Sequence, residues 1–266
     1  MSFPLFKATL KQNWIIFIIF LAILLMYMSI MISMYDPEDI AAITQFYETL
    51  PRAMLDAFAF DAPIINMITF IATYFYGFLV LMFPLIYCII LANRLVAAHV
   101  DRGSMAYLLA TPNSRPKIIF TQAVYMALSV IVLLTLTAAS GTAISEALFP
   151  GELDIAAFIK INMAAILLTL AVSSICFFFS CLFNETKHSL AVGGGVPVLF
   201  FVINMLRNIS DNFSWLEYLT IYSLFNPRAL ATGEESLLIP GLIFAAITLT
   251  LYAGGTFIFS RRNLYL

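Results

Sequence analysis

The sequence predicts an all-α membrane protein with six transmembrane helices and both termini in the cytoplasm. Hydrophobic residues make up 62% of the 266 positions and charged residues only 11%. A soluble domain of this size is nearer half apolar and a quarter charged. The apolar residues also gather in six long runs, and basic residues gather between alternate runs. Lipid must therefore be the solvent for much of the chain, which we expect to form a single transmembrane domain over residues 1–266.

Six apolar segments are long enough to cross the hydrocarbon core, which requires about 20 residues. The expected spans are residues 14–34, 64–92, 118–139, 161–183, 190–206 and 237–260. The first resembles a secretory signal, but it is longer than the ~7–15 apolar residues of a signal, and no cleavage site follows. The second must tilt or project beyond the bilayer. The fifth contains Gly193, Gly194, Gly195 and Pro197, so we expect a kink or a close helix contact there.

The distribution of lysine and arginine predicts the orientation, because these residues are retained on the cytoplasmic side. With both termini inside, the inner segments hold nine basic residues and only two acids, Asp101 and Glu185. The outer segments hold the other four basic residues and thirteen acids. We therefore expect a multi-pass protein of a bacterial cytoplasmic (plasma) membrane.

Shorter helices are expected between the spans. Residues 2–13 place four apolar side chains beside Lys7 and Lys11, the pattern of an amphipathic elbow helix along the inner membrane face. Residues 40–60 and 213–225 have near-helical apolar spacing and predict short helices at the outer interface, the latter between the fifth and sixth spans.

Several kinds of chemistry are missing from the sequence. It contains no G-x-x-x-x-G-K-[ST], H-E-x-x-H or G-x-S-x-G motif. Cys88, Cys176 and Cys181 lie in apolar stretches and predict core residues, not a metal site. No acid falls deep within a span, which argues against a proton-driven transporter. We expect no enzyme activity, no cofactor or metal bound by this chain, no nucleic-acid partner, and energy supplied by another chain.

The inner connection at residues 93–117 is the most specific local feature. Gly103 can end one helix and Ser104 can begin the next, whose exposed apolar side would include Met105, Leu108 and Leu109. Pro112 then ends that helix. The segment is either a lever for a partner protein or a turn that packs against the spans, and the residue pattern alone leaves both open.

The run Asp101–Arg115 resembles a pattern of six-helix ABC-exporter permeases, the transmembrane subunits of ABC-type-2 transporters of the drug and antimicrobial-peptide type. That pattern is acidic–x–Gly–[Ser/Thr]–x–x–x–Leu–Leu–[Ala/Ser]–x–Pro–x–Ser–Arg. The ending at residues 259–264 is similar to the family's close, with Asn263 where Asp is common. Residues 47–51 and 57–61 resemble its first outer loop, and the amphipathic start resembles its elbow helix. The resemblance covers essentially the whole chain.

The resemblance implies that the inner segment is a coupling helix that docks onto a separately encoded ATPase. The residues expected at this contact are Asp101, Arg102, Gly103, Ser104, Met105, Leu108, Leu109, Pro112 and Arg115. A second, smaller inner contact would involve Asn184, Glu185 and Lys187. The expected assembly pairs two copies of the ATPase, which would bind ATP and Mg²⁺, with a permease dimer made of this chain and either a second copy or a related permease.

Polar residues in or near the spans could line a substrate path: Asn66, Thr69, Tyr74, Tyr76, Asn162, Thr169, Ser173 and Asn204. The alternative, favoured for any one of them, is a hydrogen bond to a neighbouring helix or a place in an aromatic belt. By analogy the expected cargo is an amphipathic peptide, drug or lipid-like molecule moved outward, with immunity to antimicrobial peptides the first expectation. The alternative function is a membrane assembly or sensor subunit that transports nothing and regulates a cytoplasmic partner.

Overall fold

The computed structural model describes residues 1–36, 49, 51–57, 66–105, 107, 113–209 and 211–262. Over these residues the regular structure is helical, and six helices are long and apolar enough to cross a membrane. The prediction of an all-α membrane protein with six spans is therefore confirmed, and the chain is a multi-pass membrane protein.

The six spans are built from eleven helical elements within the described residues. The first, third, fourth and sixth spans are single helices: α1 Phe3–Met34, α8 Arg115–Leu148, α9 Ile155–Leu182 and α13 Leu238–Arg261. The second span consists of α4 Met67–Ile71, η1 Ala72–Leu79, α5 Val80–Leu95 and α6 Ala97–Asp101. The fifth span consists of α10 Thr186–His188, η2 Ser189–Gly194 and α11 Gly195–Ile209. The expected elbow segment continues into the first span as one helix, α1.

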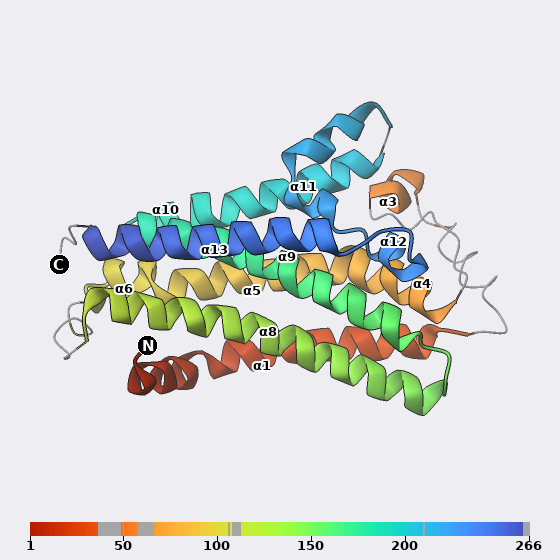
Figure 1. Ribbon diagram of the computed structural model, residues 1–266, viewed down its shortest axis with the longest axis horizontal. Coiled ribbons are helices and arrows are strands. Elements are labelled where there is room, and N and C mark those ends of the chain that lie inside the picture. Colours follow the sequence, from red (N-terminus) through yellow and green to blue (C-terminus); the bar gives the residue numbers. More distant parts are fainter. Residues whose placement is uncertain are drawn as a thin grey trace.

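Both ends of the described chain lie at the same end of the bundle (Figure 1). This end, which also carries α6 and α10, is named the terminal end here. The opposite end, with α4 and α12, is named the distal end. Which end faces the cytoplasm stays a prediction.

Four shorter helical elements lie outside the six spans within the described residues. They are α3 Arg52–Ala57, the 3₁₀ segments η3 Asp211–Leu219 and η4 Ile221–Leu224, and α12 Pro227–Thr232. Helices α3 and α12 lie at the distal end (Figure 1), whereas η4 reaches into the bundle, where Tyr222 lines a small cavity with Leu85 and Val172. The helices expected over residues 213–225 are thus confirmed. Of the segment 40–60, only α3 and Thr49 fall within the described residues.

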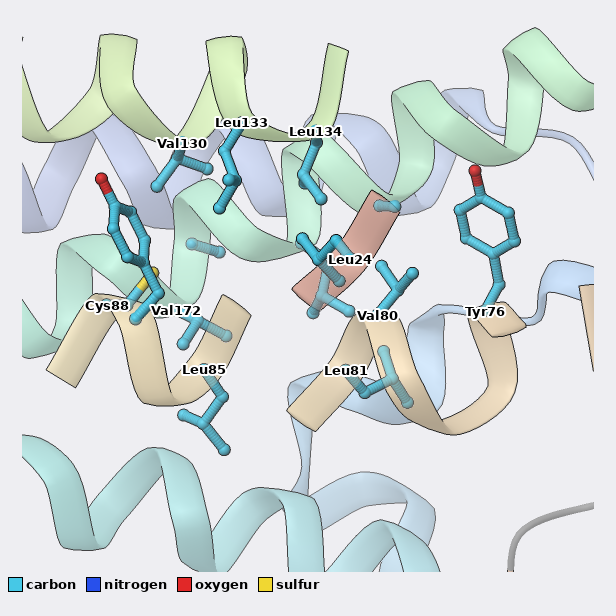
Figure 2. Packing of buried hydrophobic residues seen from close by; sticks show 14 of the residues in the cluster. Leu24, Tyr76, Val80, Leu81, Leu85, Cys88, Val130, Leu133, Leu134 and Val172 are labelled. Atoms are coloured by element: carbon cyan, nitrogen blue, oxygen red, sulfur yellow. The ribbon is translucent and has the colours of Figure 1, made fainter. Parts of the chain in front are cut away.

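Helix α9 is the central helix of the bundle. It contacts α5, α8, α11, α12 and α13. In its most apolar stretch of 18 residues, 67% of the residues are buried, compared with 22% in α1, 22% in the fifth span and 17% in α13. Figure 2 shows side chains such as Leu24, Val80, Leu133 and Val172 meeting between these helices. The three predicted core cysteines are all buried. The first, fifth and sixth spans are the ones left to face lipid or other chains.

Small residues allow the helices to approach closely, which matters because lipid leaves little hydrophobic driving force between them. A Cβ atom on Gly141 would lie 3.0 Å from Met28 Cε, between α8 and α1. A Cβ atom on Gly193 would lie 3.0 Å from Phe179 Cβ on α9. Gly193 belongs to the π-helical η2, and a Cβ atom on Gly194 would lie 3.1 Å from Ile89 Cγ2. The predicted close helix contact is therefore confirmed at Gly193 and Gly194 but not at Gly195, where nothing lies within 4 Å.

Candidate functional site

The chain bends sharply where the second span leaves the bundle at the terminal end. Helix α5 ends at Leu95, and Val96 has φ −129° and ψ −72°, outside the helical region. Helix α6 follows, and Gly103 then has φ 68°, a left-handed conformation that glycine adopts without strain. The predicted break at Gly103 is therefore confirmed.

Ser104 and Met105 turn back toward the bundle. The Ser104 hydroxyl donates to the His99 carbonyl oxygen (3.2 Å) and lies 3.0 Å from His99 Nδ1. Met105 is 1% exposed and belongs to the hydrophobic core. The prediction that Met105 lies on an exposed apolar side is wrong, because the Gly103 turn directs it inward.

The other expected coupling residues are divided between the surface and the undescribed part of the chain. Asp101, Arg102 and Gly103 are exposed. Tyr107, which the sequence did not single out, is 80% exposed. Leu108, Leu109 and Pro112 lie outside the described residues. The exposed part of the segment thus lies at the terminal end, next to α6.

A buried serine on α9 satisfies the backbone groups that the break at Val96 leaves without helical partners. The Ser180 hydroxyl donates to the Ala92 carbonyl oxygen (2.9 Å) and accepts from the Ala97 N–H (3.3 Å). The Ser189 hydroxyl donates to Ser180 Oγ (3.2 Å). Unsatisfied backbone groups are costly where water is absent. Ser180 therefore ties α5, α6 and η2 to the central helix.

Two arginines close the same end of the bundle through backbone carbonyls. Arg115, at the start of α8, donates to the Arg262 carbonyl oxygen (3.1 Å). Arg262 in turn donates to the Cys181 carbonyl oxygen (2.7 Å), one of the last carbonyls of α9. A cation is favourable at a helix C-terminus, where carbonyls lack helical partners. Arg115, expected at the ATPase contact, is thus already bound within the subunit.

The turn at residues 184–188 packs beside the coupling segment, since α10 contacts α6. Lys187 Nζ lies 2.8 Å from Glu185 Oε2, and both side chains are exposed. The hydrogen bond and the positive charge of Lys187 lower the pKa of the Glu185 carboxyl. Asn184 is half-buried. The structure therefore brings the two expected inner contacts together.

Most of the expected substrate-path residues are bonded inside the subunit. Asn66 and Thr69 form a reciprocal cap at the start of α4. Thr169 bonds to the Ala165 carbonyl of its own helix (2.7 Å). Tyr74 is 3% exposed, with its ring against Phe70.

Hydrogen bonds between spans use three more of them. Tyr76 points toward α9 (Figure 2) and donates to Asn162 Oδ1 (2.6 Å). The Ser173 and Tyr252 hydroxyls lie 2.7 Å apart, joining α9 to α13. Asn204 lines a larger cavity, together with two arginines.

This cavity, named the distal cavity, has a volume of about 310 Å³. It lies between the second span, α11 and the segment that includes α12. Its lining residues are Ala72, Thr73, Gly77, Leu81, Asn204, Arg207, Asn208, Phe225, Asn226, Pro227, Arg228, Ala229, Thr232 and Glu234. Such a volume is within the range of small-molecule sites, about 300–1,000 Å³.

Local irregularity in the second span shapes one wall of the distal cavity. Residues Ala72–Leu79 are π-helical, and the Val80 N–H reaches back to the Phe75 carbonyl. Pro84, inside α5, has no N–H to donate to the preceding turn. π-helical turns occur often at functional sites.

The sequence analysis did not assign Arg207, Asn208, Arg228 or Glu234 to a site, although they line the cavity together. Asn204, Arg207 and Asn208 have the i, i+3, i+4 spacing that places side chains on one helix face. That spacing was the available signal. The opposite wall, with Arg228, comes from a segment whose position the sequence does not indicate.

The comparison with protein families gave one match. The model of a family described as ABC-2 family transporter protein matches residues 6–264, nearly the whole chain. A search for similar curated proteins gave no match.

Proposed function

Because the chain belongs to the ABC-2 family of transporter proteins, we propose that it is the transmembrane permease subunit of an ATP-driven exporter. In this proposal a separate ATPase hydrolyses ATP with Mg²⁺ and drives the export of an amphipathic peptide, drug or lipid-like molecule. The terminal end is cytoplasmic, in a bacterial plasma membrane. Two permeases, identical or related, pair with two ATPase subunits.

The observation that carries the proposal is the exposed segment after α6, in a chain that lacks a nucleotide-binding motif. Tyr107 is 80% exposed, so its ring is accessible to a partner protein. The exposed turn with Glu185 and Lys187 lies beside α6. Together they offer an ATPase two neighbouring contacts on one surface.

Ser180 and Arg262 supply a physical route from this surface into the spans. When ATP closes the ATPase pair, a movement of α6 pulls on Ser180, because this side chain bonds both flanks of the α5–α6 break. Ser180 lies on α9, which contacts the other spans. A displacement of the coupling segment is thus transmitted to the centre of the bundle, which switches between inward- and outward-facing states.

The cargo class follows from the apolar character of the spans and from family analogy, which is a weak warrant for a substrate. Immunity to antimicrobial peptides is the first cargo to examine. The assay is reconstitution of this chain with its ATPase in lipid vesicles, with ATP hydrolysis and vectorial movement of a labelled peptide measured together. Hydrolysis without movement of any cargo favours the regulatory subunit instead.

Docking is tested without knowing the cargo. Leu108→Asp and Leu109→Asp should release the ATPase or abolish its stimulation while membrane insertion stays intact. Unchanged co-purification and unchanged stimulation in both variants contradict the docking assignment.

A matched pair of exposed tyrosines sharpens this test. Tyr107→Ala, at the terminal end, should weaken ATPase stimulation at least fivefold. Tyr218→Ala, on η3 beside α11 and 84% exposed, should leave it within error. If the two substitutions change ATPase stimulation equally, the ATPase does not bind at Tyr107.

A further inference from the structure

Polar side chains line much of the distal cavity, although 62% of the residues of the chain are hydrophobic. One wall is the second span, with Thr73 and Gly77; another is α11; the third is the stretch from Phe225 to Glu234. A helix bundle in lipid gains stability when side chains fill its interior. An open cavity of about 310 Å³ therefore does not stabilise the fold.

Arg207 is the central feature of this cavity. Its side chain is half-buried, and among the described residues it forms no salt bridge or hydrogen bond. A guanidinium withdrawn from water is costly unless its charge is paired. Asn204 and Asn208 lie on the same face of α11 and line the cavity as well. The Asn208 side chain also donates to the Ala57 carbonyl oxygen (3.4 Å), which fixes its position.

Among the described lining residues, Arg207 and Arg228 are cationic and Glu234, which is exposed, is anionic. The anion preference of the cavity is carried by Arg207, since its guanidinium has no charged partner among the described residues. The fork of N–H donors of a guanidinium matches carboxylate and phosphate oxygens.

Part of the remaining lining is apolar and comes from the second span, with Ala72, Gly77 and Leu81, and from Phe225 opposite. An inorganic anion would leave these surfaces without a partner. A molecule with an anionic head and an apolar tail satisfies both kinds of wall.

We propose that the distal cavity binds the carboxylate or phosphate head group of an amphipathic molecule, held by Arg207. This rests on the proposed function, since it names the chemical class of the exported cargo. An anionic lipid of the bilayer carries the same head-group chemistry, so the test must separate the two sources.

Binding is measured on the purified full chain in a neutral detergent, without ATPase or ATP. The probes are lysophosphatidic acid and lysophosphatidylcholine with the same acyl chain, the two-chain lipids phosphatidylglycerol and phosphatidylcholine, and inorganic phosphate alone. Ligand binding to the folded state raises the Tm, so titrations of Tm yield apparent affinities. We expect lysophosphatidic acid to bind at least tenfold more tightly than lysophosphatidylcholine.

Three variants link this preference to the cavity. Arg207→Gln should weaken binding of lysophosphatidic acid about tenfold or more, the effect of losing one charge-assisted hydrogen bond. Lys160→Gln removes an exposed cation of α9 that does not line the cavity and should change nothing. Glu234→Gln should tighten binding, because it removes the one carboxylate. Arg207→Lys, which keeps the charge, should bind better than Arg207→Gln and controls for folding.

Each outcome decides the proposal. Equal affinity for lysophosphatidic acid and lysophosphatidylcholine overturns it, as does equal loss in Arg207→Gln and Lys160→Gln. Inorganic phosphate binding as tightly as lysophosphatidic acid overturns the amphipathic part. Phosphatidylglycerol binding as tightly, and depending on Arg207, supports the anion site and identifies a bilayer lipid as the occupant. Because the ATPase is absent, a failure of ATP-driven transport leaves this result unchanged.

Discussion

The two ends of the bundle use their polar side chains differently. At the terminal end, Ser180 and Arg262 bond backbone groups of other elements, and Arg115 bonds the Arg262 carbonyl. At the distal end, Arg207 and Asn204 line a cavity of about 310 Å³. Polar groups at the terminal end therefore hold the helices together, whereas Arg207 and Asn204 at the distal end are available to a ligand.

This difference assigns separate tasks to the two ends. A surface that receives force must be rigidly connected to the spans, or its displacement is lost in local bending. A site that binds and releases cargo must instead keep polar groups free of strong internal partners. Substitutions test this difference. They should lower the free energy of unfolding strongly where a side chain joins helices at the terminal end, and only slightly where it does not.

The largest effect is expected at Gly193, where η2 touches α9. Gly193→Leu should lower the free energy of unfolding by about 3 kcal/mol, because even a Cβ atom would lie 3.0 Å from Phe179 Cβ. Gly195→Ala is the matched control: nothing lies within 4 Å of the added Cβ atom, so the variant should be neutral or stabilised by up to ~1 kcal/mol. Thermal unfolding in detergent measures both. A Gly193→Leu protein as stable as the control would show that this contact is loose.

Ser180 should give the next largest effect. Ser180→Ala leaves the Ala92 carbonyl and the Ala97 N–H without their side-chain partner, at a cost of about 1–2 kcal/mol. Ser174→Ala, on the same helix and equally buried, loses only a bond to the Ala171 carbonyl of its own helix and should cost less than about 0.5 kcal/mol. Unfolding transitions of the two variants provide the comparison. Equal losses would mean that Ser180 does not brace the α5–α6 break.

The sequence alone predicted the six spans and the close contact at Gly193, because apolar length and glycine clusters are local signals. The helix ends were less predictable. Helix α8 runs to Leu148, beyond the expected end at residue 139, and α9 starts at Ile155, ahead of residue 161. Hydropathy marks where lipid ends, whereas a helix ends where its backbone loses partners. The Asp154 carboxylate, which accepts from the Ala157 N–H, sets the start of α9.

The candidate sites were predicted unequally for the same reason. The coupling segment is continuous in sequence, so a local pattern could predict it, but its contact with an ATPase stays a prediction and Met105 is buried. The distal cavity joins Thr73, Arg207 and Arg228 from three distant segments, and no pattern in one segment shows that the others lie opposite. The Ser180 contacts likewise depend on helix packing.

A smaller effect is expected at Arg262. Arg262→Gln removes the bond to the Cys181 carbonyl oxygen (2.7 Å) and should cost about 1 kcal/mol, since the guanidinium is partly exposed. The neighbouring Arg261 is exposed and lies 4.3 Å from the Phe257 ring centre, so Arg261→Gln should cost about 0.5 kcal/mol. Chemical denaturation measures the pair. If Arg261→Gln costs more stability than Arg262→Gln, the bond between Arg262 and the Cys181 carbonyl does not stabilise the terminal end.

The smallest effect on stability is expected at the exposed turn. Lys187 lowers the pKa of the Glu185 carboxyl, so this interaction adds stability above the ordinary carboxyl pKa and loses it as the pH falls through the lowered value. Lys187→Gln should return the Glu185 pKa toward its ordinary range, as followed by the ¹³Cδ shift of labelled glutamate, with Glu185→Gln for assignment. Because both side chains are exposed, the Tm at neutral pH should stay within error.

Substitutions at the same turn distinguish residues that stabilise the fold from residues that contact the ATPase. If Lys187 faces the ATPase, Lys187→Glu should reduce ATPase stimulation while the Tm remains that of the unsubstituted protein, whereas Ser180→Ala should lower the Tm. A loss of Tm in Lys187→Glu comparable to that in Ser180→Ala would contradict this division, because the turn would then be part of the braced structure. Stimulation that is unchanged at constant Tm would instead remove this turn from the docking surface and leave the segment near Gly103 as the contact to test.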